Sequence, residues 1–239
     1  MDSSLREEYL QAMGIQQWIP RDSGVGDAVD PEAITWEEAG TESVAPTAAA
    51  VAGLDWPALE SRVSACTQCV LHEARTRTVF GTGNREADWL IIGEAPGADE
   101  DRQGEPFVGR AGQLLTEMLN AIGHPRKDVY ITNILKCRPP KNRDPLPGEV
   151  ASCHAYLERQ IELIGPGLIL AVGRIAAHNL LQTDIPVGRL RGQVHHYGKA
   201  GIPLVVTYHP AYLLRSPLEK RKSWQDLQLA QQASGVCRT

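Results

Sequence analysis

From residue 56 onward, short apolar runs alternate with stretches in which apolar residues recur every three or four positions. The short runs predict buried β-strands, and the amphipathic stretches predict helices. This alternation is typical of an α/β fold with a three-layer αβα arrangement around a central four-stranded parallel sheet. Strands are predicted at residues 89–92, 129–132, 168–172 and 203–206, and helices at 56–64, 111–122, 149–164 and 174–181. Residues 189–198 and 202–206 are expected to form a hairpin.

Polar residues gather where the predicted strands end. The sequence GEAPG at 93–97 follows the first strand, Asn133 the second and His209 the last. In open parallel sheets, ligands bind beyond the carboxyl ends of the strands. We therefore expect a ligand site that is built from these three segments.

The first 55 residues have a different composition. Residues 22–55 are rich in Gly, Ala, Pro, Ser, Thr and acidic residues without periodicity, which is typical of a disordered linker. Residues 1–54 carry a net charge of −8, so the remainder carries +3, which permits nucleic-acid binding without indicating it. We expect a mostly disordered acidic leader at 1–55, a folded domain at 56–232 and a short tail at 233–239.

Four cysteines follow a pattern that is typical of metal binding. Cys66 and Cys69 form a CxxC turn, whereas Cys137 and Cys153 lie far along the chain. Four thiolates complete the coordination shell of a zinc ion or of an iron–sulfur cluster, and the spacing leaves both open. No apolar signal-peptide core or membrane-length run occurs, so a cytosolic location with reduced thiols is expected. Cys237 is expected to be a bystander.

Four separate motifs occur in order along the chain. They are CTQC at 66–69, GEAPGADEDRQGEPFVGRAGQLL at 93–115, TNILKCRPPKNRDP at 132–145 and HPAYLLR at 209–215. Together they resemble a bacterial member of family 4 of the uracil-DNA glycosylases, the iron–sulfur class of base-excision repair enzymes. The resemblance covers residues 56–230, so the leader would be an N-terminal extension. It implies an enzyme that flips uracil out of DNA, hydrolyses the N-glycosidic bond and leaves an abasic site.

The resemblance also implies a [4Fe–4S] cluster on Cys66, Cys69, Cys137 and Cys153, with zinc as the alternative. We assign the cluster a structural role, because hydrolysis of a glycosidic bond transfers no electron. Apolar flanking residues are expected to shelter it: Val70, Leu71, Ile134 and Leu135.

Residues that bind uracil in the family match positions in these motifs. The resemblance makes Phe107 the stacking partner of the flipped base. It makes Asn133 the residue whose amide donates to O4 and accepts from N3–H of uracil. Glu100 matches the acid that excludes the C5 methyl group of thymine, with a solvated acidic loop as the alternative. Gly93 and Ala95 complete the expected pocket.

Cleavage develops negative charge on uracil and positive charge on the sugar. His209 matches the family's motif histidine, which can donate a hydrogen bond to O2 of the leaving base. Glu94 is the candidate for orienting the water or stabilising the sugar cation. The best-studied uracil glycosylases carry an aspartate where this chain has Ala95. Stabilisation of the leaving group and of the cation must therefore supply most of the acceleration.

Contacts with DNA are expected in two places. Leu214 is expected to lie on a loop and to fill the space that the flipped nucleotide leaves. Arg215 is expected to contact a phosphate. A second group of basic residues either contacts the DNA backbone or forms a solvated face. That group is Lys136, Arg138, Lys141 and Arg143. The same two alternatives apply to Arg189 and Arg191.

Residues 5–21 form an apolar segment within the leader. Its run YLQAMGIQQWIPR resembles the N-terminal peptide of the psi subunit of the bacterial replicative polymerase, which implies docking on the clamp loader; a frayed helix is the alternative. The expected substrate is uracil-containing DNA, single- or double-stranded, and the chain is expected to be monomeric. The alternative function is a non-catalytic uracil- or single-stranded-DNA-binding module with a structural metal. A complete set of Glu94, Phe107, Asn133 and His209 favours the enzyme.

Overall fold

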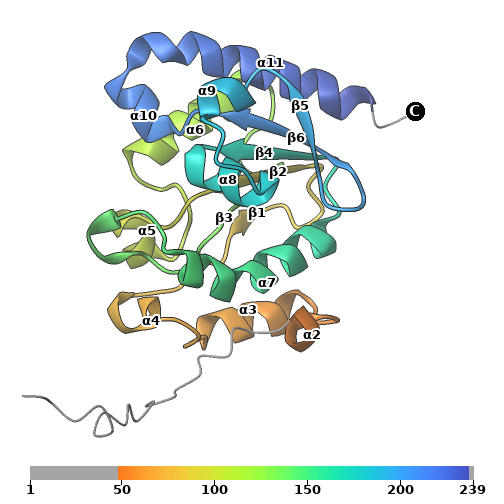
Figure 1. Cartoon of the computed structure of the whole chain (residues 1–239). Helices are drawn as coiled ribbons and strands as arrows, with labels where there is room; N and C mark the ends of the chain where they lie inside the picture. The colour runs from red at the N-terminus through yellow and green to blue at the C-terminus, as the bar shows by residue number, and fades with distance from the viewer. Residues whose placement is uncertain (1–47, 237–239) are drawn as a thin grey trace, which may run out of the picture. The chain divides into compact units, whose positions relative to one another are not determined.

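The structure, a computed structural model, describes residues 48–236 (Figure 1). The expected docking peptide at 5–21, most of the expected leader and Cys237 lie outside these residues. Among the helices in the described range, none is long and apolar enough to cross a bilayer.

A six-stranded sheet lies at the centre of the described residues, in the order β1-β3-β2-β4-β6-β5. The four inner strands are parallel, whereas β1 and β5 pair antiparallel at the two edges. The predicted parallel sheet and the predicted hairpin, formed by β5 and β6, are confirmed, and β1 is an addition. The strands are β1 (Thr82–Gly83), β2 (Trp89–Gly93), β3 (Tyr130–Asn133), β4 (Leu168–Val172), β5 (Val194–Tyr197) and β6 (Ile202–Thr207).

Both faces of the sheet are buried, which explains why its inner strands are continuous apolar runs. In β2, Leu90 and Ile92 belong to the core on one face, and Trp89 and Ile91 to the core on the other. The predicted three-layer αβα architecture is therefore confirmed. The first face is covered by α7 (Pro147–Ile164), α8 (Arg174–Leu181) and α9 (Val187–Leu190), and the second by α6 (Arg110–Ala121) and α11 (Lys220–Val236).

A further layer lies along the outer side of α7 (Figure 1). It contains α2 (Ala48–Val51) and α3 (Trp56–Ser64), whose buried residues include Val51 and Leu59. The helix α2 falls within the range 22–55 that we expected to be linker. Burial of Val51 against this layer accounts for the earlier start of the folded part.

Several short elements have no counterpart among the predicted helices. One of them, α10, changes an expectation, because Leu214 lies on this helix and not on the expected loop. Pro at the first helical position and a capping side chain start α10, and such caps give no periodicity to detect. The other short elements are α4 (Leu71–Ala74), α5 (Ala98–Gln103), the 3₁₀ turns Pro140–Asn142 and Pro217–Glu219, and α10 itself (Pro210–Arg215).

Candidate active site and cysteine cluster

The carboxyl ends of the parallel strands meet at one cleft with a volume of about 870 Å³. Strand register places Gly93 opposite Asn133, and the N–H of Gly173 donates to the carbonyl of Thr207 at 2.9 Å. The expected convergence of the three strand-end segments is confirmed. Predicted residues that line the cleft are Glu94, Ala95, Glu100, Phe107, Asn133, Arg143, His209 and Arg215.

Asn133 lies on the floor of this cleft with 2% of its surface exposed. Its Oδ1 atom is buried and has no hydrogen-bond partner among the described residues. A Cβ atom at Gly93 would lie 2.5 Å from that oxygen and 2.5 Å from Cζ of Phe107. Only glycine at position 93 therefore lets the amide and the aromatic ring approach the end of β2 together. An unpaired buried acceptor beside a ring suits a planar ligand that offers an N–H group.

Phe107 and His209 form the walls of the cleft next to this floor. Their ring centroids are 5.7 Å apart with an interplanar angle of 30°. Phe107 has a φ of 55°, a left-handed conformation that non-glycine residues rarely adopt. Such strain is often found where a side chain is held in place for function.

His209 is a neutral imidazole in this environment. Burial, and next the charge of Arg215, lower the pKa of His209 to about 4. Its Nδ1 atom accepts the N–H of Ala211 at 3.1 Å, so the ring proton lies on Nε2. A Cβ atom at Gly173 would lie 2.9 Å from Cβ of His209, so glycine at this position allows the close approach. The site thus offers a fixed N–H donor that carries no charge.

Glu94 is half-buried at the end of β2. Burial, and next the nearby charge of Asp144, raise the pKa of Glu94, while Arg174 opposes the shift. Arg174 and Asp144 form an ion pair of 2.6 Å. Neither residue was singled out for this role, because only the folded chain brings the three charges together. The site therefore has one carboxyl group with a raised pKa, at Glu94. The next residue, Ala95, adds no second carboxyl group.

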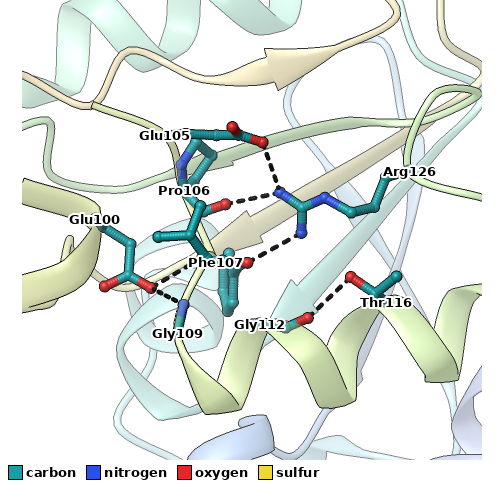
Figure 2. Close-up of polar contacts among 9 residues, drawn as sticks. Glu100, Glu105, Pro106, Phe107, Gly109, Gly112, Thr116 and Arg126 are labelled. Atoms are coloured by element: carbon teal, nitrogen blue, oxygen red, sulfur yellow. Dashed lines mark hydrogen bonds and ion pairs between the residues drawn. The ribbon is translucent and has the colours of Figure 1, made fainter. Parts of the chain in front are cut away.

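Glu100 is not part of a solvated acidic loop. It lies on α5, and its Oε1 atom accepts the backbone N–H groups of Val108 and Gly109 at 3.1 and 3.2 Å. Figure 2 shows its carboxylate directed at the segment that carries Phe107. Glu100 therefore fixes one wall of the cleft.

The residues expected to contact DNA divide into two groups. Leu214 has 39% of its surface exposed, and Arg215 lines the cleft. Lys136 is only 1% exposed, so the expectation of a phosphate contact or solvated face is wrong for this residue. Arg191 also differs, because it pairs with the buried Asp226 at 2.9 Å.

Lys136 lies between the cleft and the cysteines. Its ammonium donates to the carbonyl of Asn133 at 2.8 Å and to Thr132 Oγ1 and Gln160 Oε1 at 2.6 Å. Burial lowers the pKa of Lys136 to about 7. The next residue, Cys137, belongs to the cysteine group, so one short segment serves both regions.

Several residues that line the cleft were not predicted. Two of them, Arg174 and Tyr208, lie outside the four motifs, whereas Arg110 and Tyr212 lie within motifs but were assigned no role. Positive charge and aromatic rings at the rim suit a polyanion with exposed bases. These residues are Arg110, Arg174, Tyr208 and Tyr212.

Three of the four cysteines form one apolar cluster. Cys137 and Cys153 are buried with Leu71 and Leu135, and Cys69 and Ala95 pack against them. These two leucines lie beside the cysteines as expected, whereas Val70 is 62% exposed and Ile134 joins the main core. The cluster therefore adjoins the GEAPG segment of the cleft through Ala95.

The surroundings of the cysteines are of the kind that stabilises thiolates. Arg75 Nη1 donates to Sγ of Cys137 at 3.2 Å. The N–H groups of Leu71 and Lys136 bind Cys69 and Cys153, and Tyr156 hydrogen-bonds to Cys66. Burial nevertheless raises the pKa of the Cys69, Cys137 and Cys153 thiols, so a cationic group is needed to hold them as thiolates.

In the part of the chain that the structure describes, no group of three or more Cys, His, Asp or Glu side chains is gathered for a metal ion. Nδ1 of His72 lies 2.8 Å from the carbonyl oxygen of Cys69. His72 thus has a partner of its own outside the thiol set.

Comparisons with known proteins show similarity to uracil-DNA glycosylases. The family model of the uracil DNA glycosylase superfamily matches residues 80–228. The chain is 49% identical to the type-4 uracil-DNA glycosylase of Archaeoglobus fulgidus, over 65% of this chain and 81% of the relative. It is 46% identical to that of Thermotoga maritima, over 66% and 82%. For the type-4 enzyme of Pyrobaculum aerophilum the identity is 42%, over 73% and 92%.

Proposed function

The chain belongs to the type-4 uracil-DNA glycosylases, and on that premise we propose how its residues carry out the reaction. It is a DNA repair enzyme that excises uracil by hydrolysing the N-glycosidic bond. In our proposal the flipped base enters the strand-end cleft, leaves as free uracil and leaves an abasic site in the DNA.

Uracil is recognised by the floor and wall of the cleft. The unpaired Oδ1 of Asn133 accepts N3–H, and the amide nitrogen donates to O4. Cytosine has no N3–H and has an amino group at C4, so both hydrogen bonds fail. Phe107 stacks on the ring, while Gly93 and Ala95 leave room for its edge. Glu100 and the segment it holds limit the space at C5 and thereby exclude thymine.

Cleavage is driven by stabilisation of the charges that form as the bond breaks. The C1′–N1 bond lengthens, uracil takes the electron pair, and the Nε2–H of His209 donates to O2 as negative charge grows there. A pKa of about 4 keeps His209 neutral, so its proton remains on the enzyme. Glu94, as the carboxylate, stabilises the cationic sugar and orients the water that forms the new C1′–O bond. Water adds to a sugar that is already cationic and then loses a proton, which balances the proton that the departing uracil anion takes up from solvent. A strong base is therefore not required, and Ala95 in place of a basic aspartate is tolerated.

A [4Fe–4S] cluster on Cys66, Cys69, Cys137 and Cys153 is part of this proposal, with zinc as the alternative. It is supported by the polar partner at each thiol and by the apolar shell. Bound there, the group would cross-link the CxxC turn, the segment after β3 and the helix α7. We assign it no role in bond cleavage.

The remaining contacts of the proposal concern DNA and location. Leu214 fills the space of the flipped nucleotide and Arg215 contacts a phosphate beside the cleft. The substrate is uracil in single- or double-stranded DNA, and the enzyme acts as a monomer. A cytosolic location suits the free thiols of the described cysteines.

Residues 5–21 tether the enzyme to the clamp loader in this proposal. The support is the apolar run of this segment within an acidic leader. Deletion of residues 1–21 should leave uracil release in vitro unchanged and abolish co-precipitation with purified clamp loader. Equal co-precipitation by the shortened and the full chain would remove the tether from the proposal.

The observation that carries the proposal is the buried, unpaired Oδ1 of Asn133 beside Phe107 and the neutral His209. The test is release of uracil from a uracil-containing oligonucleotide by anaerobically purified protein. His209→Ala should lose nearly all release, whereas His196→Ala, on the exposed strand β5, should retain it. Folded, metal-replete protein that binds the oligonucleotide but releases no uracil would favour the non-catalytic binding module.

A further inference from the structure

The segment 104–109 carries Phe107 in a conformation that needs support from outside the segment. Phe107 has a φ of 55°, in the left-handed region that disfavours side chains. Its carbonyl faces α6, where a Cβ atom at Gly112 would lie 1.8 Å from that oxygen. Gly112 therefore leaves room for the backbone at Phe107, but glycine has no side chain that could hold Phe107 in this conformation.

Arg126 supplies that attraction from a distant part of the chain. Its Nη1 donates to the carbonyl of Phe107 at 3.1 Å, and its Nη2 to the carbonyl of Pro106 at 2.8 Å. Nη2 also reaches a carboxylate oxygen of Glu105 at 3.3 Å. Figure 2 shows the guanidinium alongside the segment, with Phe107 between it and Glu100. Two consecutive carbonyls are thus held by one planar group.

The two sides of the segment are held by groups of opposite charge. Glu100 accepts the N–H groups of Val108 and Gly109, which follow Phe107. Arg126 donates to the carbonyls of Phe107 and of the residue before it. Both polar ends of the peptide units around Phe107 are therefore bound by charged side chains, whose hydrogen bonds are stronger than those of neutral groups.

We infer that Arg126 is a positioning residue for uracil, which acts by holding Phe107 in its stacking conformation before the base arrives. Arg126 does not line the cleft, so its influence on the base passes through Phe107. The inference rests on the proposed function, which makes Phe107 the stacking partner. A lysine cannot replace it fully, because a single ammonium lacks the planar pair of donors that matches two consecutive carbonyls.

The first test is single-turnover kinetics of uracil release together with inhibition by free uracil. Arg126→Gln should lower kcat/KM and weaken inhibition by about 10- to 100-fold, the loss expected for hydrogen bonds to a charged donor. Arg126→Lys should lose less. Arg85→Gln is the matched control. Arg85 forms an ion pair of 2.8 Å with Glu60, and neither residue lines the cleft. Glu105→Gln should also retain release, since both carbonyl contacts remain.

A double-mutant cycle separates positioning from a general effect on the fold. In the Phe107→Ala background, Arg126→Gln should cost less than about 2-fold, because the ring on which Arg126 acts is absent. An equal loss in both backgrounds would overturn the inference and leave Arg126 with a structural role. Wild-type kinetics in Arg126→Gln would overturn it as well.

Hydrogen exchange gives a readout that does not depend on catalysis. In Arg126→Gln the amides of segment 104–109 should exchange faster, while those of the central strands keep their protection. Unchanged exchange in this segment would overturn the inference even if wild-type protein released no uracil. A lack of uracil release by the wild-type protein would by itself contradict the proposed function, so the failure of the inference and the failure of the proposed function are distinguishable.

Discussion

The cleft and the cysteine cluster differ in how their polar groups are satisfied. In the cleft, Asn133 Oδ1 is buried without a partner among the described residues, and His209 uses Nδ1 for the backbone so that Nε2 keeps its proton. In the cysteine cluster, the thiols have polar partners, such as the Arg75 guanidinium, which donates to Sγ of Cys137 at 3.2 Å. Unpaired groups suit a base that binds and leaves, whereas thiols with fixed polar partners suit a permanently bound group.

The two regions share one segment, residues 132–137. Lys136 holds the carbonyl of Asn133 with its ammonium and binds Cys153 with its backbone N–H. A change in one region therefore has a short route to the other. Substitutions in the cleft, in the shared segment and at the histidine of the cleft test this difference between the two regions.

Asn133→Asp should have the largest effect, because it replaces the group that reads the base. The carboxylate cannot donate to O4, and a buried mismatch of this kind lowers kcat/KM for uracil by about 1000-fold or more. Activity on cytosine should rise relative to activity on uracil. Release of both bases from matched oligonucleotides measures this, with Asn120→Asp on the exposed face of α6 as the control. Full uracil activity in Asn133→Asp would show that another residue reads the base.

Lys136→Met should affect both regions at once. It leaves Thr132 Oγ1, the carbonyl of Asn133 and Gln160 Oε1 without their shared ammonium, at a cost of about 2–4 kcal/mol in the free energy of unfolding. Uracil release and metal content should both fall. Chemical denaturation, metal analysis and kinetics measure the three effects. Lys141→Met provides the control, because Lys141 is exposed in the same stretch of sequence.

If Lys136→Met loses stability but keeps both uracil release and metal content, the two regions are independent despite their shared segment. A loss confined to metal content would show that the lysine serves the cysteines alone. Only a combined loss agrees with the contacts on both of its sides.

The central sheet could be predicted because its inner strands are buried on both faces and separated by amphipathic helices. Candidate residues at the strand ends followed from the family motifs and from the rule for parallel sheets. Lys136 could not be placed correctly, because a lysine in a basic stretch gives no sign that it is buried or that Gln160, 24 residues further on, is one of its partners. Arg126 was missed for the same reason, since its contacts join segments about 20 residues apart.

Short elements were also beyond prediction. The helix α10 depends on Pro210 and on the cap from His209, and α5 is only six residues long. A helix of this length has too few turns for an apolar period. Its existence is decided by caps and by the tertiary structure, which are not visible in the composition of the segment.

The smallest expected effect tests whether the cleft keeps His209 neutral. The pKa of His209 is about 4 in the folded protein, below the ordinary 6.5, because burial and next Arg215 disfavour the charged ring. Between these values the unfolded chain binds more protons, so stability is complete above pH 6.5 and falls as the pH drops toward 4. The loss amounts to about 3 kcal/mol over this range.

His209→Asn removes this titration and retains a side chain that can cap α10. The wild type should therefore lose about 3 kcal/mol more than His209→Asn when urea unfolding is compared at pH 7 and pH 4. His196→Asn, on the exposed edge of the sheet, should follow the wild type. If the wild type and His209→Asn lose stability in parallel, the imidazole carries its charge as easily in the cleft as in water. The cleft would then resemble the cysteine cluster in compensating its polar groups, and a neutral donor to the leaving base would have no support.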